Sequence, residues 1–98
     1  MTAYLMITYD VTNPERLADY NPGKADELRA TIDKHGGQVL AAGPGDATVG
    51  STPERSVLLS FPDADAAKAW QADDEYAPLK AIRYEATTNI SEVLLASN

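Results

Sequence analysis

Three side chains in this sequence have the chemistry for proton transfer: Asp10, Tyr20 and His35. His35 is the only histidine, and imidazole has an ordinary pKa near neutrality, so it is the first candidate for a general acid or base. His35 also stands directly before Gly36-Gly37. A histidine in the last turn of a helix can instead bond the free carbonyl groups there, so a structural role is the alternative.

Asp10 and Tyr20 each have two interpretations as well. Asp10 ends an apolar strand, where a carboxylate can have a raised pKa and act as a base, or can simply cap the following turn. Tyr20 stands at a predicted helix break, which gives its phenol room to point at a substrate or at a buried partner. We therefore take Asp10, Tyr20 and His35 as the candidate catalytic residues.

The candidate binding residues are Trp70, Tyr76 and Arg83. Trp70 and Tyr76 lie in and just beyond one predicted helix, beside the edge of a sheet, where they can form a wall of a pocket or part of an ordinary core. Arg83 can hold the carboxylate or carbonyl oxygen of a substrate. It can also pair on the surface with Glu85 or Asp74.

Composition excludes several classes of function. The 98 residues include 15 acidic and 8 basic side chains, a net charge of −7, which argues against nucleic acid or an anionic membrane as partner. The absence of cysteine excludes disulfides, thiolate catalysis and Cys-ligated metals, and a single histidine excludes a His-rich metal site in one chain. We expect no cofactor. The first ten residues lack the basic region of a signal peptide, so we expect a cytoplasmic protein.

The first half of the chain predicts a strand, a broken helix and a second strand. Residues 3–11 alternate as a strand does, and Asn13-Pro14 is typical of a helix start. Asn21-Pro22-Gly23 interrupts that helix, and we expect Asn21 to cap its continuation, which ends at Gly36 in the left-handed conformation. The second strand spans residues 38–42.

The second half repeats this pattern. A long connection follows the second strand, and residues 47–49 are predicted to form a small extra strand within it. A strand over residues 56–61, a helix capped by Asp63, a short helix from Pro78 and a strand over residues 89–96 complete the chain. The order β-α-β-β-α-β predicts one α+β domain over residues 1–98, a ferredoxin-like four-stranded antiparallel sheet with the helices on one face.

The other sheet face would remain uncovered in a monomer. The first and third strands carry apolar side chains on both faces, so a lone copy would expose an apolar patch. We therefore expect a homodimer formed through the sheet faces.

Two blocks of sequence resemble a known bacterial family, domain of unknown function 1330. They are DELRATIDKHGGQVLAAG and SVLLSFPDADAAKAWQADDEYAPLKAIR, with Phe61-Pro62, Trp70 and Glu75-Tyr76 as the most specific positions. The resemblance implies a dimeric α+β barrel, in a superfamily that includes cofactor-free monooxygenases, isomerases and cyclases. Where the family often has a basic residue or Ser-Pro, this chain has Ala42 and Asp73-Asp74, which argues against an anionic ligand near the pocket mouth.

Two functions from different classes follow. The first is a cofactor-independent enzyme acting on a small apolar or aromatic carbonyl compound in the cleft between sheet and helices. The second is a non-catalytic, small-molecule-binding or stress-related dimeric module that uses the same cleft. Loss of turnover on substitution of Asp10 and His35 would favour the first, and binding without product would favour the second.

Overall fold

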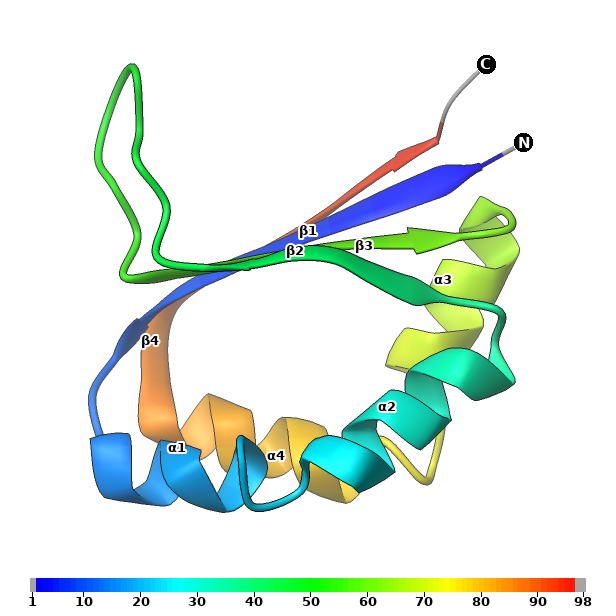
Figure 1. Ribbon diagram of the computed structural model, residues 1–98, viewed down its shortest axis with the longest axis horizontal. Coiled ribbons are helices and arrows are strands. Elements are labelled where there is room, and N and C mark those ends of the chain that lie inside the picture. Colours follow the sequence, from blue (N-terminus) through cyan, green and yellow to red (C-terminus); the bar gives the residue numbers. More distant parts are fainter. Residues whose placement is uncertain (1, 97–98) are drawn as a thin grey trace.

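The computed structural model describes residues 2–96, and the helices lie against one face of an antiparallel sheet (Figure 1). The sheet has four strands in the order β2-β3-β1-β4. Along residues 2–96 the elements are β1 (Ala3–Val11), α1 (Pro14–Tyr20), α2 (Ala25–Lys34), β2 (Gln38–Gly43), β3 (Arg55–Phe61), α3 (Ala64–Gln71), α4 (Ala77–Ala86) and β4 (Thr87–Ala96). This is the predicted ferredoxin-like α+β fold, with each crossover split into two helices.

The helical crossover between β1 and β2 begins as predicted but resumes later than predicted. The Asn13 side chain accepts a hydrogen bond from the Arg16 N–H at 3.1 Å, and Pro14 occupies the first turn of α1. Asn21 does not cap α2, because its backbone is extended and its N–H donates to the Leu17 carbonyl to close α1. The chain then turns, and Lys24 becomes the residue that precedes α2.

The second half shows one further difference from the sequence prediction. Asp63 caps α3 as expected, accepting from the Ala66 N–H at 2.7 Å. Residues 47–49 do not form a strand; the segment between β2 and β3 is an irregular loop that rises past the sheet, on the side away from the helices (Figure 1). Val49 in this loop is 90% exposed.

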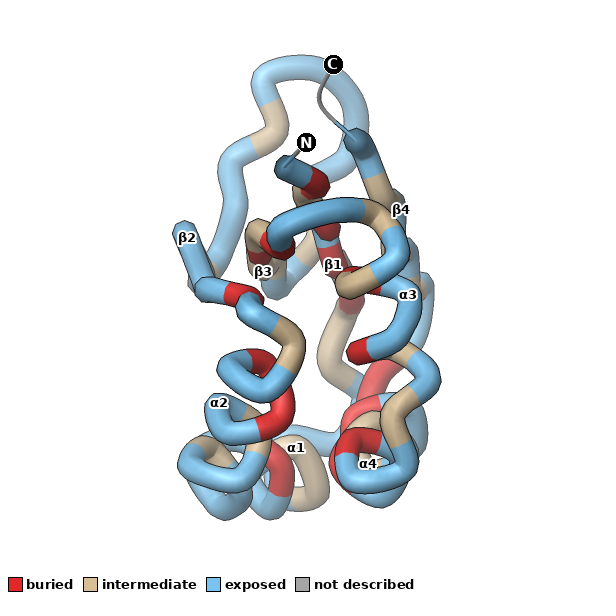
Figure 2. Tube along the Cα trace, turned by 90° about the vertical axis from the view of Figure 1, so that its right-hand side faces the viewer, coloured by how far each residue is buried: buried red, intermediate tan, exposed pale blue. Residues whose placement is uncertain are grey.

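The core lies between the sheet and the helices, where the buried residues gather (Figure 2). Strand alternation directs Leu5, Ile7 and Tyr9 of β1 to this side, and the register pairs Leu5 with Leu59 of β3. Gly37 allows the chain to pass close to this core, since a Cβ there would lie 2.6 Å from a Phe61 ring atom. The inner sheet face therefore presents both core residues and the residues that line a cavity.

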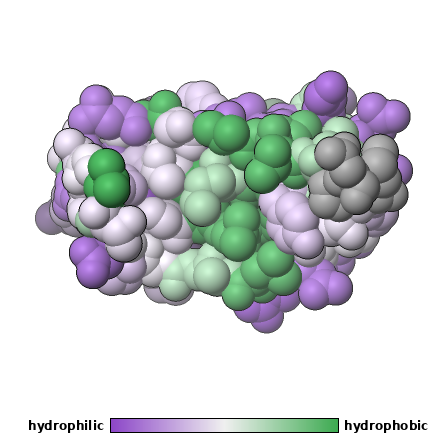
Figure 3. All heavy atoms as spheres, turned by 90° about the horizontal axis from the view of Figure 1, so that it is seen from above, coloured by the Kyte–Doolittle hydropathy of each residue, from purple (hydrophilic) through white to green (hydrophobic). Residues whose placement is uncertain are grey.

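The opposite sheet face carries an apolar band across its centre (Figure 3). Met6 of β1 pairs with Leu58 of β3 and with Val93 of β4, while Tyr4 pairs with Leu95. Met6, Val93 and Leu95 are 41%, 57% and 67% exposed. No helix within residues 2–96 combines the length and the apolar character needed to cross a bilayer.

Candidate functional site

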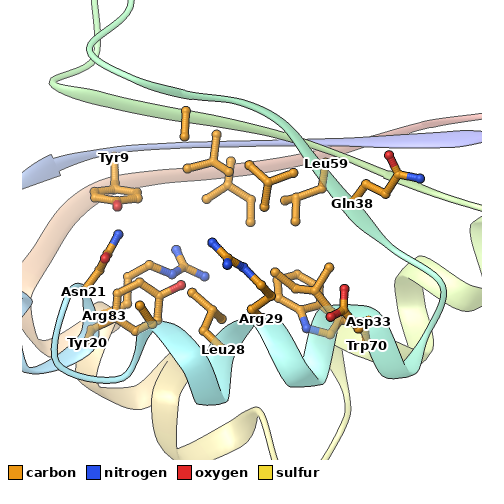
Figure 4. Close-up of a pocket in the computed structure, with 16 residues that line it drawn as sticks. Tyr9, Tyr20, Asn21, Leu28, Arg29, Asp33, Gln38, Leu59, Trp70 and Arg83 are labelled. Atoms are coloured by element: carbon orange, nitrogen blue, oxygen red, sulfur yellow. The ribbon is translucent and has the colours of Figure 1, made fainter.

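A cavity of about 540 Å³ lies between the inner face of the sheet and the helices (Figure 4). Its apolar lining comes from the strands and from α2 and α3. Its polar lining residues are Tyr9, Tyr20, Asn21, Arg29, Asp33, Gln38 and Arg83. A mainly apolar hollow of this size with a few polar groups has the form of a small-molecule site.

Trp70 lines this cavity, and a buried hydrogen bond fixes its orientation. Its Nε1–H donates to Thr31 Oγ1 of α2 at 3.1 Å. Its ring stacks on Tyr76 with centroids 4.1 Å apart and contacts Phe61 at 5.7 Å. Tyr76 is fully buried behind Trp70 and does not itself line the cavity.

Arg83 is the buried charged residue of the cavity. Only 1% of it is exposed, so the surface pairing with Glu85 or Asp74 that the sequence allowed does not occur. Its Nη2 donates to Tyr76 Oη at 3.1 Å and to Glu92 Oε1 at 3.2 Å. Its Nε and Nη1 are also buried, and no group in residues 2–96 accepts from them.

Unpaired donors of this kind are costly in a protein interior. A buried polar group without a partner costs about 1–3 kcal/mol, and more when it is charged. The Arg83 side chain lines the cavity and points into the space between the helices and the sheet (Figure 4). Arg83 is therefore the strongest indication of ligand binding in residues 2–96.

Two tyrosines share the cavity with Arg83. Tyr20, at the end of α1, is buried, and burial raises its pKa well above the ordinary value. Burial also raises the pKa of Tyr9, on β1, whose ring centroid lies 5.7 Å from Arg83 Cζ. Both phenols are therefore protonated at neutral pH and can donate hydrogen bonds to a ligand oxygen.

Asp10 lies outside the cavity. Its Oδ2 accepts from Asn89 Nδ2 at 2.9 Å and its Oδ1 from the Glu54 N–H at 3.0 Å. These bonds lower its pKa, which is opposite to the raised pKa that the sequence suggested for a base at this position. The carboxylate ties the start of β3 and the start of β4 to β1.

His35 also lies away from the cavity lining. Its Nε2 donates to Asp73 Oδ2 at 2.6 Å, and Lys34 Nζ lies 3.0 Å from the same oxygen. The imidazole thus joins the end of α2 to the turn between α3 and α4, rather than bonding the last carbonyls of its own helix. Asp73 and Asp74 do not line the cavity either, so of the two departures from the family pattern only Ala42, which does line it, still bears on the charge of a ligand.

The sequence interpretation missed five polar lining residues: Tyr9, Asn21, Arg29, Asp33 and Gln38. Tyr9 could have been found, because it continues the alternation of Leu5 and Ile7 on the inner face of β1. Arg29 and Asp33 lie next to the apolar stripe of α2, and the sequence pattern assigned them to the solvent-facing side of that helix. Among residues 2–96, no cluster of three or more His, Cys, Asp or Glu side chains is arranged to hold a metal ion.

The overall shape is similar to that of several solved structures at low sequence identity. A protein of unknown function from Rhodopseudomonas palustris is 14% identical with a TM-score of 0.73, over 99% of this chain and 82% of that one. A dimeric ferredoxin-like protein of unknown function from Jannaschia is 12% identical with a TM-score of 0.75, over 99% and 100%. The cofactor-independent oxygenase SnoaB from Streptomyces nogalater is 11% identical with a TM-score of 0.68, over 99% and 93%.

At these identities the similarity shows the fold alone. A comparison with curated proteins finds no match. The model of the family "Domain of unknown function (DUF1330)" matches residues 2–96, and the chain therefore belongs to the DUF1330 family.

Proposed function

We propose that this protein is a cofactor-independent enzyme that acts on a small apolar or aromatic carbonyl compound. The proposal depends on Arg83, which lines a cavity of about 540 Å³. Its Nε and Nη1 are buried, and no group in residues 2–96 accepts a hydrogen bond from either. The carbonyl oxygen of the substrate accepts from Arg83, the phenol of Tyr20 donates to the same oxygen, and Trp70 contacts the apolar body.

This arrangement suits reactions that pass through an enolate. When a base removes the proton from the carbon next to the carbonyl, the electron pair of the C–H bond moves toward the oxygen, which becomes negative. A buried guanidinium that is already held in place stabilises that charge more strongly than water does. The fold similarity to a cofactor-independent oxygenase supports an enzyme that works without a cofactor.

Asp33 is our candidate for the base. It is the one carboxylate among the cavity-lining residues of the described chain. It would take the proton from the substrate carbon and return it in an isomerisation. The proton-transfer roles predicted for Asp10 and His35 stay predictions, since neither side chain lines the cavity.

A non-catalytic binding module is the second candidate. The observation that favours it is that neither Asp10 nor His35, the first choices for proton transfer, is directed at the cavity. In that case Arg83 and Trp70 hold a metabolite without changing it.

We also propose that the protein is a homodimer in which two sheets pack face to face. The exposed apolar band of Met6, Leu58, Val93 and Leu95 supports this, because soluble monomers rarely leave such a patch uncovered (Figure 3). Similar solved structures are described as dimeric, which supports the same arrangement.

Hydrogen exchange at carbon tests the enzymatic proposal. Small aromatic ketones and 2-oxo acids are incubated with the protein in D₂O, and proton NMR follows deuterium entry next to the carbonyl. We expect exchange with the wild type, a loss of about 10²-fold or more in Arg83→Met, and no change in Arg55→Met, a control at an exposed arginine outside the cavity.

Arg83→Met removes a buried charge and can fail to fold, so Tyr20→Phe provides a second test. It keeps the ring and removes only the donor, and we expect about a 10-fold loss of exchange. Binding without exchange in the wild type would overturn the enzymatic proposal in favour of the binding module. The absence of both binding and exchange would overturn both.

A further inference from the structure

Two guanidinium groups from different helices are directed into the same cavity. Arg83 comes from α4 and Arg29 from α2, and the close-up shows both side chains extending from their helices toward the sheet (Figure 4). One arginine is enough to bind the neutral carbonyl oxygen of a ligand. A second positive charge at the same cavity favours a ligand that also carries a negative charge.

Arg29 is not engaged elsewhere. Residues 2–96 provide it with no ion pair and no hydrogen-bond acceptor, although Asp33 stands one helical turn away on α2. Arg29 and Asp33 are both exposed on α2. Here both side chains line the cavity, and Arg29 remains available to a ligand.

Three charged residues line the cavity: Arg29 and Arg83 are positive and Asp33 is negative. Arg83 is offset by Glu92, which reaches its Nη2 from β4. Arg29 and Asp33 are the other charged lining residues. A ligand carboxylate would pair with Arg29, and the chain concentrates two arginines here although its net charge is −7.

The remaining wall of the cavity is apolar. Side chains of Leu28, Val57, Leu59 and Trp70 line it, and α2 presents Leu28 beside Arg29. An aromatic or branched aliphatic body fits such a wall, and 540 Å³ lies within the range of small-molecule sites.

We infer that the ligand of this cavity is a small aromatic or apolar oxo acid, whose carboxylate pairs with Arg29 while its carbonyl oxygen accepts from Arg83. This inference rests on the proposed function and narrows its substrate class. Arg29 thereby becomes a specificity-determining residue, and Arg83 the residue that holds the reacting carbonyl.

Calorimetric titration with matched acids and methyl esters tests the inference. The probes are phenylpyruvate, benzoylformate and 4-phenyl-2-oxobutanoate, each against its own methyl ester, which keeps the carbonyl and the ring and removes the charge. We expect the wild type to bind at least one acid ten-fold or more tightly than its ester. In Arg29→Gln the affinity for that acid should fall to the affinity for the ester, while the affinity for the ester stays unchanged.

Arg55→Gln is the matched control, since this exposed arginine lies outside the cavity and its loss should keep the preference for the acid. Equal binding of acids and esters would overturn the inference without contradicting the proposed binding of a carbonyl compound. A preference for acids that survives in Arg29→Gln would overturn the role of Arg29. Failure of every probe to bind would overturn both the inference and the proposed function.

Discussion

Arg83 donates through Nη2 to the phenol oxygen of Tyr76 at 3.1 Å, and both side chains are almost completely buried. The same Tyr76 ring stacks on Trp70. One residue that does not line the cavity thus holds both the guanidinium and the indole that do.

This relationship gives the first prediction, for Tyr76→Phe. The ring and its stack on Trp70 remain, while Arg83 Nη2 keeps only Glu92 as acceptor. We expect a loss of about 1–3 kcal/mol in the free energy of unfolding, because a buried charged donor loses a partner. Urea denaturation measures it. Tyr4→Phe, on the other sheet face, is the control, and an equal loss there would contradict the explanation.

The second prediction concerns the hydrogen bond that orients Trp70. Thr31→Val keeps the shape of the side chain but leaves the buried Trp70 Nε1–H without its acceptor at 3.1 Å. We expect the free energy of unfolding to fall by about 1–3 kcal/mol and the indole fluorescence to change. Thr48→Val, in the exposed loop, should do neither. Unchanged fluorescence in Thr31→Val would show that packing alone fixes the ring.

The third prediction is a pH dependence of stability from Asp73. Hydrogen bonds from His35, Lys34 and the Glu75 backbone N–H hold the pKa of Asp73 far below its ordinary value. A lowered pKa in the folded state stabilises the protein above the unfolded pKa of about 3.9, and that contribution is lost as the pH falls toward the folded pKa.

Asp73→Asn should therefore lower the urea midpoint at pH 6, and the difference from the wild type should shrink steadily between pH 4 and pH 2. The amide oxygen can still accept from the Glu75 N–H, so the turn is preserved. Asp74→Asn, its exposed neighbour in the same turn, serves as the control. A difference that stays constant with pH would refute the assignment.

The fourth prediction tests the proposed dimer. Val93 is 57% exposed in the apolar band, on the edge strand β4 and paired with Met6. Val93→Glu places two like charges in a face-to-face interface, so we expect a folded monomer at micromolar concentration in sedimentation velocity, where the wild type is a dimer. Val49→Glu in the loop between β2 and β3 should leave the dimer intact. A wild-type protein that sediments as a monomer would contradict the proposed homodimer.

The sequence alone predicted the parts of this fold that depend on residues close together in the chain. Asn13 and Asp63 cap helices through bonds to the N–H three residues later, and Gly36 takes a φ of 73° at the end of α2. Such bonds form within one turn, so residue type is enough to predict them. Strand alternation likewise predicted the two sheet faces.

The candidate site depended on tertiary structure. Arg83 is buried because Tyr76, Glu92 and the sheet surround it, whereas its helix position alone also allowed a surface role. His35 and Asp73 are 38 residues apart and meet only because α2 packs beside the turn after α3. Packing decides which side chains lose water and which meet, and residue type in the chain does not carry that information.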